Sequence, residues 1–144
     1  MINGEKTMKM FLGEYQPNIT EGSRIALPKK LREQITSGEV ILSRGFEACI
    51  FVYDKQDWLL EAQKQLEKPI TDSYVRDLKR YLYASASEST IDDQGRFVVP
   101  NNLKDYADLE KKTVVIGAGD HIEIWNQDVW NAHLSKISKS LAQI

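Results

Sequence analysis

The sequence predicts a mainly β protein with helices, of the α+β class, in which one architecture occurs twice. Residues recur at an offset of 72 along the 144-residue chain, so the two halves are related. Each half carries short runs of β-branched residues between glycine- or proline-containing turns, which is typical of short strands. Because a unit of about 70 residues buries little surface alone, we expect the two repeats to share a sheet.

The repeat is clearest around two arginines. Four residues of the first half reappear unchanged in the second: Ile19 as Ile91, Arg24 as Arg96, Pro28 as Pro100 and Leu31 as Leu103. Trp58 and Trp130 follow at the same offset. The agreement therefore extends from the first turn of each repeat to the helix that closes it.

Each repeat begins with two short strands around a turn. One strand ends near Ile19 or Ile91, a polar turn with a glycine follows, and an apolar strand begins at the arginine. Proline then ends that strand and opens a short helix, predicted over 28–34 in the first repeat and 100–106 in the second.

Each repeat ends with a hairpin and a helix. Runs of β-forming residues around a glycine-containing turn predict the hairpins, over 40–53 and 113–125. The closing helices begin near tryptophan, with Asp57 and Asp128 as the expected N-caps. An apolar stripe at helical spacing predicts one more helix, over 72–86, that bridges the repeats.

These elements divide the chain into five segments that form one compact unit. They are an N-terminal tail (1–10), the first repeat (11–66), a bridging helical segment (67–86), the second repeat (87–134) and a C-terminal tail (135–144).

The composition excludes several classes of protein. Nineteen basic residues against 21 acidic ones give a formal charge of −2 and a pI near 5.7, so the overall composition does not point to nucleic acid. No apolar stretch approaches the roughly 18 residues of a membrane helix, and the N-terminus lacks the apolar segment of a signal peptide. We therefore expect a cytoplasmic protein that contacts no membrane.

The residue inventory also argues against catalysis. Cys49 is the only cysteine, which excludes an intrachain disulfide and a cysteine-based metal site, and its apolar neighbours predict a buried side chain. His121 and Glu123 lie at alternate positions of a predicted strand, but two ligands are too few for a metal. No serine or cysteine has a histidine in a recognisable activating context. We expect no enzyme, metal, cofactor or small-molecule substrate.

The turns resemble those of a known family. Asp92, Gly95 and Arg96 form a D-x-x-G-R motif that is followed by Pro100 and a short helix, and the pattern of arginine, proline and helix occurs twice across a helical bridge. In these features the chain resembles the bacterial MraZ family, a branch of the AbrB/SpoVT/MazE-type DNA-binding proteins. The resemblance extends from about residue 11 to residue 130.

The resemblance implies a fold, an assembly and a function. The fold is an internally duplicated AbrB/MazE-type β-barrel of the double-split, swapped-hairpin kind, and the assembly is a ring-shaped homo-oligomer. The function is that of a nucleoid-associated, sequence-specific transcriptional regulator. Such a protein binds tandem repeats in the double-stranded promoter DNA of its own division and cell wall gene cluster.

The family's DNA-facing residues carry over unevenly. The second motif matches fully at Asp92, Gly95 and Arg96, whereas the first matches only at Arg24. Thr20 and Ser23 stand where the family has aspartate and glycine, and a glycine lies one place earlier at Gly22. Because a serine disfavours positive φ, we expect the first turn to use Gly22 instead of Ser23.

The charges also differ between the repeats. Residues 18–36 carry four basic residues against two acidic ones, whereas residues 90–108 carry two against four. We therefore expect phosphate contacts mainly in the first repeat, from Arg24, Lys29, Lys30 and Arg32. Arg96 either reads a base edge or forms an ion pair with its neighbouring aspartate. For the helix cations, a solvated surface remains the alternative.

A second hypothesis comes from a different class of function. The altered first motif and the acidic pI are also compatible with an antitoxin-like or scaffold module that binds proteins and has weakened DNA binding. Such a module would bind a protein partner with little salt dependence. The aromatic residues at matching positions in the two repeats are predicted to belong to the core: Tyr53, Trp58, Trp125 and Trp130.

Overall fold

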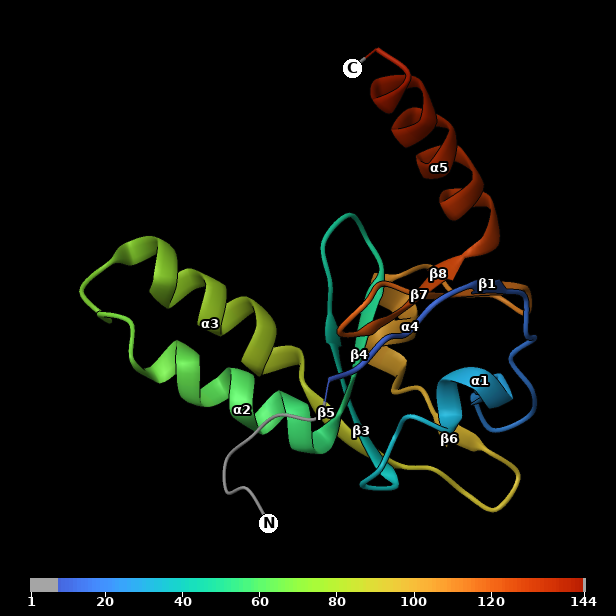
Figure 1. Ribbon diagram of the computed structural model, residues 1–144, viewed down its shortest axis with the longest axis horizontal. Coiled ribbons are helices and arrows are strands. Elements are labelled where there is room, and N and C mark those ends of the chain that lie inside the picture. The colour runs from blue at the N-terminus through green and yellow to red at the C-terminus, as the bar shows by residue number, and fades with distance from the viewer. Residues whose placement is uncertain (1–7, 144) are drawn as a thin grey trace.

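A computed structural model describes residues 8–143 and confirms the α+β class (Figure 1). Its strands form two antiparallel sheets. The larger sheet has the order β1 (Glu14–Tyr15), β7 (Thr113–Gly117), β8 (Ile122–Asn126), β4 (Ile50–Asp54), β3 (Glu39–Arg44) and β5 (Ser87–Thr90). The smaller sheet pairs β2 (Arg24–Ala26) with β6 (Arg96–Val98). The helices are α1 (Lys29–Arg32), α2 (Lys55–Leu66), α3 (Ser73–Ser85), α4 (Asn101–Tyr106) and α5 (Gln127–Leu141).

The two repeats exchange strands. The first strand of the first repeat, β1, pairs with β7 of the second repeat, and β5 of the second repeat pairs with β3 of the first. The strands that begin at the arginines, β2 and β6, pair with each other. The repeats therefore share both sheets, as expected. Strands β1 and β5 are the two edges of the larger sheet, so the described strands do not close into one continuous barrel.

The core lies between the two sheets and draws on both repeats. Ile25 of β2 and Phe97 of β6 are 0% and 1% exposed. Leu31 of α1 and Leu103 of α4 pack into the same cluster. Since each of these pairs is separated by 72 residues, the repeated sequence builds a core with approximate twofold symmetry.

A second, smaller core lies under α5. Trp125 and Trp130 are buried there with Cys49, which confirms the prediction for these three residues. The indole Nε1 of Trp130 donates to Glu14 Oε1 at 3.0 Å, so its polar edge is satisfied. Burial raises the pKa of the Cys49 thiol, which makes it a small apolar side chain rather than a nucleophile.

The helices begin where the repeat places them, although two predicted caps are wrong. Helices α2 and α5 follow strands β4 and β8 without a loop, so they begin before Asp57 and Asp128. The last residue of each strand supplies the cap instead. Asn126 Oδ1 accepts from the backbone N–H groups of Asp128 and Val129, and Asp54 Oδ1 accepts from that of Gln56 at 3.2 Å.

Helices α2 and α3 form a hairpin that projects from one side of the sheets, while α5 projects from another (Figure 1). Asp72 caps α3, whose bounds confirm the predicted bridging helix. Helix α5 continues through most of the segment that was predicted to be a C-terminal tail, as far as Leu141. No helix among residues 8–143 is long and apolar enough to cross a bilayer.

The N-terminal segment was predicted to be a tail, and residues 1–7 lie outside the described part. Lys9, however, is buried. Its Nζ lies 3.0 Å from Asp54 Oδ2 and 3.7 Å from Asp57 Oδ2. Asp54 also accepts from Ser37 Oγ at 2.6 Å and from the backbone N–H of Thr36 at 2.8 Å. Burial opposes ionisation of Asp54, but these hydrogen bonds outweigh it and hold the pKa of Asp54 below its ordinary value.

Candidate nucleic-acid interface

The β2–β6 pair places Arg24 and Arg96 on one exposed face. Arg24 lies opposite Val98, and Arg96 lies opposite Ala26. Residues directly opposite each other in an antiparallel pair share a face, and neighbours along a strand alternate. The two arginines, Ala26 and Val98 therefore face outward, while the intervening residue of each strand faces the core.

Exposure agrees with this pattern. Val98 is 42% exposed and Ala26 is also exposed, whereas the inward residues Ile25 and Phe97 are buried. The arginines stand two residues apart along the strand pair, which is roughly 7 Å. Two guanidinium groups thus flank a small apolar centre on a solvent-facing surface.

The second turn, residues 92–96, is organised by Asp92. Its Oδ1 accepts from the backbone N–H groups of Gln94 and Arg96, both at 2.9 Å, and its Oδ2 accepts from Arg96 Nε at 3.0 Å. The backbone hydrogen bond from Arg96 is the largest cause of the lowered pKa of Asp92. Gly95 supplies the positive φ of 76° that the turn requires. The predicted ion pair is therefore present, and it fixes the direction of the Arg96 side chain.

The first turn, residues 20–24, keeps the same backbone frame without the aspartate. The backbone N–H of Thr20 donates to the Arg24 carbonyl at 2.8 Å, as that of Asp92 donates to the Arg96 carbonyl. Gly22 has a positive φ of 81°, as expected. Ser23 was expected to avoid positive φ, but its φ is also positive, at 59°. The serine therefore keeps the left-handed conformation of its counterpart, Gly95.

Arg24 is held differently from Arg96. Its Nη1 donates to the Glu21 carbonyl at 3.4 Å, a long bond to a neutral acceptor, and it has no carboxylate partner among the described residues. Thr20 Oγ1 instead donates to the Arg24 backbone carbonyl at 3.3 Å. The guanidinium of Arg24 is consequently less constrained than that of Arg96.

Each turn also receives a cation from the helix of the other repeat. Arg32, at the end of α1, packs against Gly95 of the second turn. Lys104 of α4 donates from Nζ to Ser23 Oγ in the first turn, at 2.9 Å. Sequence reasoning placed Arg32 beside Arg24 and left Lys104 out of the site. The matching offset of 72 for both pairs was the available signal, but it has this meaning only once the strand exchange is known.

The two lysines of α1 have other surroundings. Lys29 Nζ lies 3.9 Å from Glu33 Oε1 on the same helix, and its side chain is 76% exposed. Lys30 borders a surface hollow that is lined by Met10, Leu12, Gly13, Tyr15 and Gln34. Among the described residues, neither lysine contacts a turn.

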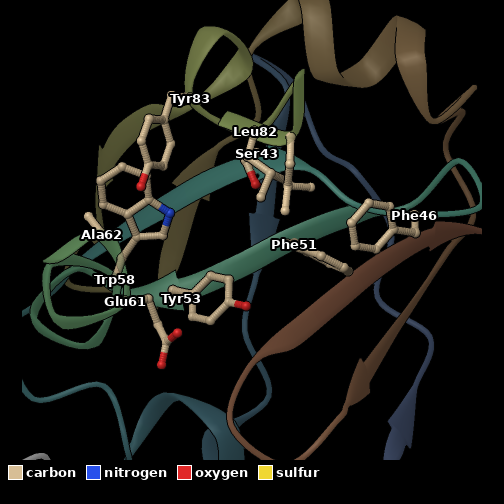
Figure 2. Close-up of a pocket in the computed structure, with 10 residues that line it drawn as sticks. Ser43, Phe46, Phe51, Tyr53, Trp58, Glu61, Ala62, Leu82 and Tyr83 are labelled. Atoms are coloured by element: carbon tan, nitrogen blue, oxygen red, sulfur yellow. The ribbon is translucent and has the colours of Figure 1, made fainter. Parts of the chain in front are cut away.

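A hollow of about 210 Å³ lies between the helical hairpin and the larger sheet (Figure 2). Trp58 of α2 and Tyr83 of α3 meet edge to face on one side, and Phe51 and Tyr53 of β4 lie below them. Trp58 and Tyr53 are therefore half-buried walls of an open hollow. This differs from the predicted core position, because the helical hairpin covers this face of the sheet only in part.

His121 forms a local ion-pair cluster. Its ring nitrogens lie 2.8 Å from Asp120 Oδ1 and 2.9 Å from Glu123 Oε2, and the ring stacks on Tyr53. In the part of the chain that the structure describes, no group of three His, Cys, Asp or Glu side chains is arranged to hold a metal ion. Burial of His121 lowers its pKa, but its hydrogen bonds to the carboxylates of Glu123 and Asp120 outweigh this effect and raise it.

Replacing His121 with glutamine should make stability less dependent on pH. Because the pKa is raised on folding, protonated His121 stabilises the fold fully below its ordinary pKa of 6.5, and this contribution is lost as pH rises through the raised value. We expect His121→Gln to cost about 1–2 kcal/mol at pH 5.5 and much less at pH 9. Urea unfolding at both pH values measures this; an equal cost at both would contradict the ion-pair assignment.

Comparison with known proteins finds the same duplication that the two turns show. The family described as "MraZ protein, putative antitoxin-like" matches twice, over residues 10–81 and 82–144. The chain belongs to the MraZ family. A "Transcriptional regulator MraZ" of Desulforamulus reducens is 36% identical over 135 residues, which is 94% of each chain. Another of that name, from Leifsonia xyli subsp. xyli, is 39% identical over 133 residues and 92% of each chain.

The MraZ match divides the chain at residue 81, inside α3. The chain thus contains two consecutive MraZ units. The similarity to its relatives covers nearly the whole length of both proteins. The strand exchange gives this duplication a structural meaning, because neither unit has a complete sheet of its own.

Proposed function

We propose that this MraZ-family protein is a DNA-binding transcriptional regulator, and that the outer face of β2 and β6 is its DNA-facing surface. One observation carries the proposal: Arg24 and Arg96 share a solvent-facing surface, while the alternate residues of the same strands, Ile25 and Phe97, are buried in the core. The names of the relatives, transcriptional regulators, support it. An arginine fork pairs with phosphate oxygens or with guanine O6 and N7, so it suits both positioning and readout.

The proposed target is double-stranded DNA with tandem repeats in the promoter of the protein's own division and cell wall gene cluster. We place the protein at the nucleoid as a ring-shaped homo-oligomer. The exchange of strands between its repeats supports a fold of the AbrB/MazE swapped-hairpin kind. Each subunit carries few cations at the turns, and assembly on tandem sites converts such weak contacts into avidity. An acidic pI is thus compatible with DNA binding, since only a local patch meets the phosphates.

A salt titration tests the proposal. The purified protein is titrated against the DNA upstream of its own gene and against a scrambled duplex of equal length, at several salt concentrations. We expect tight binding that prefers the native duplex and weakens steeply with salt. Equal, weak binding to both duplexes would overturn the proposal.

Val98 offers a single-site test of the proposed surface. Because Val98 is exposed between the two arginines, replacing it with glutamate adds a negative charge there without disturbing the core. We expect Val98→Glu to weaken DNA binding by at least about tenfold and to change thermal stability little. Electrophoretic mobility shifts measure the first effect and thermal unfolding the second.

The matched control is Val98→Thr, which keeps the branched shape and adds no charge. It should bind within about twofold of the parent protein. Val98→Glu that binds as well as Val98→Thr would show that DNA approaches another face.

A second candidate function is an antitoxin-like module that binds a protein. The description of the matched family favours it, and so does the aromatic hollow of Figure 2. The hydroxyl of Tyr83 is buried beside the hollow without a hydrogen-bond partner among the described residues. An affinity pull-down tests this function. It is favoured over the first if the parent protein captures one stoichiometric protein and no DNA, and if the Trp58→Ala variant captures no protein.

A further inference from the structure

The cations at the two turns are arranged by the same rule. Arg32 and Lys104 are separated by 72 residues, as are the turn residues that they contact, Gly95 and Ser23. The backbone repeats the symmetry: the N–H of Leu27 donates to the Gly95 carbonyl at 2.9 Å, and that of Val99 to the Ser23 carbonyl at 2.8 Å. Each short helix therefore brings its last cation to the turn of the other repeat.

We propose that each DNA-contacting unit is composite. Arg24 acts with Lys104, and Arg96 acts with Arg32, so each unit takes one cation from each repeat. Ser23 is a positioning residue, because its hydroxyl accepts the bond from Lys104 and holds the ammonium group beside the first turn. This inference rests on the proposed function and adds two phosphate-binding partners and their pairing.

The difference between the two turn residues fits the cation that each receives. At Gly95, a Cβ atom would lie 2.8 Å from Arg32 Cδ and meet the guanidinium as well, so the absence of a side chain lets the arginine rest on the backbone. At Ser23, the contact is made by a lysine, whose ammonium group is a point donor that a hydroxyl can accept from. A serine at positive φ is conformationally unfavourable, but here its hydroxyl accepts the hydrogen bond that holds Lys104 beside the turn.

The composite arrangement changes the distribution of charge. Counted along the chain, the cations belong mainly to the first repeat. Counted in space, each turn has two cations, and the two turns become similar. Both units should therefore contribute comparably to the salt dependence of binding, although the motif of the first is degenerate.

Double-mutant cycles on DNA binding test this pairing. The dissociation constant for the native upstream duplex is measured at several salt concentrations for Arg24→Gln, Arg32→Gln, Arg96→Gln, Lys104→Gln and the double variants. We expect Arg32→Gln and Lys104→Gln each to weaken binding about five- to tenfold and to reduce the salt slope by about 1. The effects of the two substitutions on binding free energy should be non-additive for Arg32 with Arg96 and for Lys104 with Arg24. They should be additive for Arg32 with Arg24.

Two further variants sharpen the test. Ser23→Ala keeps the Cβ atom and removes only the hydroxyl, so it should weaken binding about two- to threefold and have no further effect in the Lys104→Gln background. Lys139→Gln, on the exposed part of α5, removes the same charge far from the turns and should change binding less than twofold. Circular dichroism confirms that each variant is folded.

The outcomes separate this inference from the proposed function. A parent protein that shows no salt-dependent preference for the native duplex overturns both. A parent protein that binds, with Lys104→Gln as silent as Lys139→Gln, overturns the composite unit alone. The composite unit is also overturned if the effects of the Arg32 and Arg24 substitutions are non-additive while those of Arg32 and Arg96 are additive.

Discussion

Replacing Asp54 with alanine is expected to lower the free energy of unfolding by about 3–5 kcal/mol at pH 7. The side chain of Asp54 is 0% exposed and that of Lys9 is 2% exposed, so removal of the carboxylate leaves a buried ammonium without its main counter-charge. The substitution also removes the acceptor for the Thr36 backbone N–H and the Ser37 hydroxyl. Urea unfolding followed by circular dichroism measures the loss.

The pH dependence of the same variant gives an independent check. Because the pKa of Asp54 is lowered on folding, its contribution is fully present above the ordinary carboxyl pKa of about 3.9 and is lost as pH falls through the lower folded value. The difference between parent and variant should therefore be full at pH 7 and shrink below about pH 4.

Asp77→Asn is the matched control, because Asp77 also pairs with a cation, at 3.0 Å from Arg80, but its side chain is 74% exposed. Its expected cost is about 0–1 kcal/mol. If Asp54→Ala costs no more than Asp77→Asn, the buried ion pair does not anchor the N-terminal segment to the end of β4.

The internal repeat made most of the elements predictable. An offset of 72 relates Ile19 to Ile91 and Trp58 to Trp130, and it changes only to 74 at the first strand of each hairpin. Such a repeat requires equivalent strands, helices and turns, and the structure has them. The predicted caps failed for a local reason: α2 and α5 follow their strands directly, so the strand's last residue caps the helix. A sequence that places two cap-forming residues two or three positions apart does not indicate which one is used.

The pairing of the strands could not be predicted from the repeat. Identical patterns say which segments are equivalent, but not whether β1 pairs with a strand of its own repeat or of the other. The burial of Lys9 had no sequence signal either, since a lysine near the N-terminus is ordinarily exposed. Its partner Asp54 lies 45 residues away, and only the folded chain brings the two together.

The candidate site was predictable at its centre and not at its edges. The motif identified Arg24 and Arg96, and the register of β2 with β6 puts them on one face. The grouping of the surrounding cations depends on the strand exchange, so counting charges along the chain could not show that Arg32 packs against the second turn and Lys104 against the first. Sequence position is a poor guide to a surface that two exchanged repeats build together.

The double variant Arg24→Ala/Arg96→Ala is expected to lose specific DNA binding altogether. A well-placed bidentate arginine contributes about 1–3 kcal/mol of discrimination, so removal of both should cost about 2–6 kcal/mol, or roughly 30- to 20,000-fold in affinity. Neither side chain is in the core, so the fold and the mass of the assembly should not change. Fluorescence anisotropy with the native and scrambled duplexes measures affinity, and light scattering measures mass.

The asymmetry of the two turns makes the single variants informative as well. Arg96 is fixed by Asp92, whereas Arg24 has only the Glu21 carbonyl, so Arg96→Ala should lose more sequence preference than Arg24→Ala.

The control is Arg76→Ala/Arg80→Ala on α3, which removes two cations that are held by local partners instead. If the control weakens binding and the turn variant does not, DNA meets the helical hairpin. A turn variant that still selects the native duplex at the parent's affinity would remove both arginines from the site. In the proposed ring each subunit's contribution is multiplied, so even a modest loss per turn should appear as near-complete loss of binding to tandem sites.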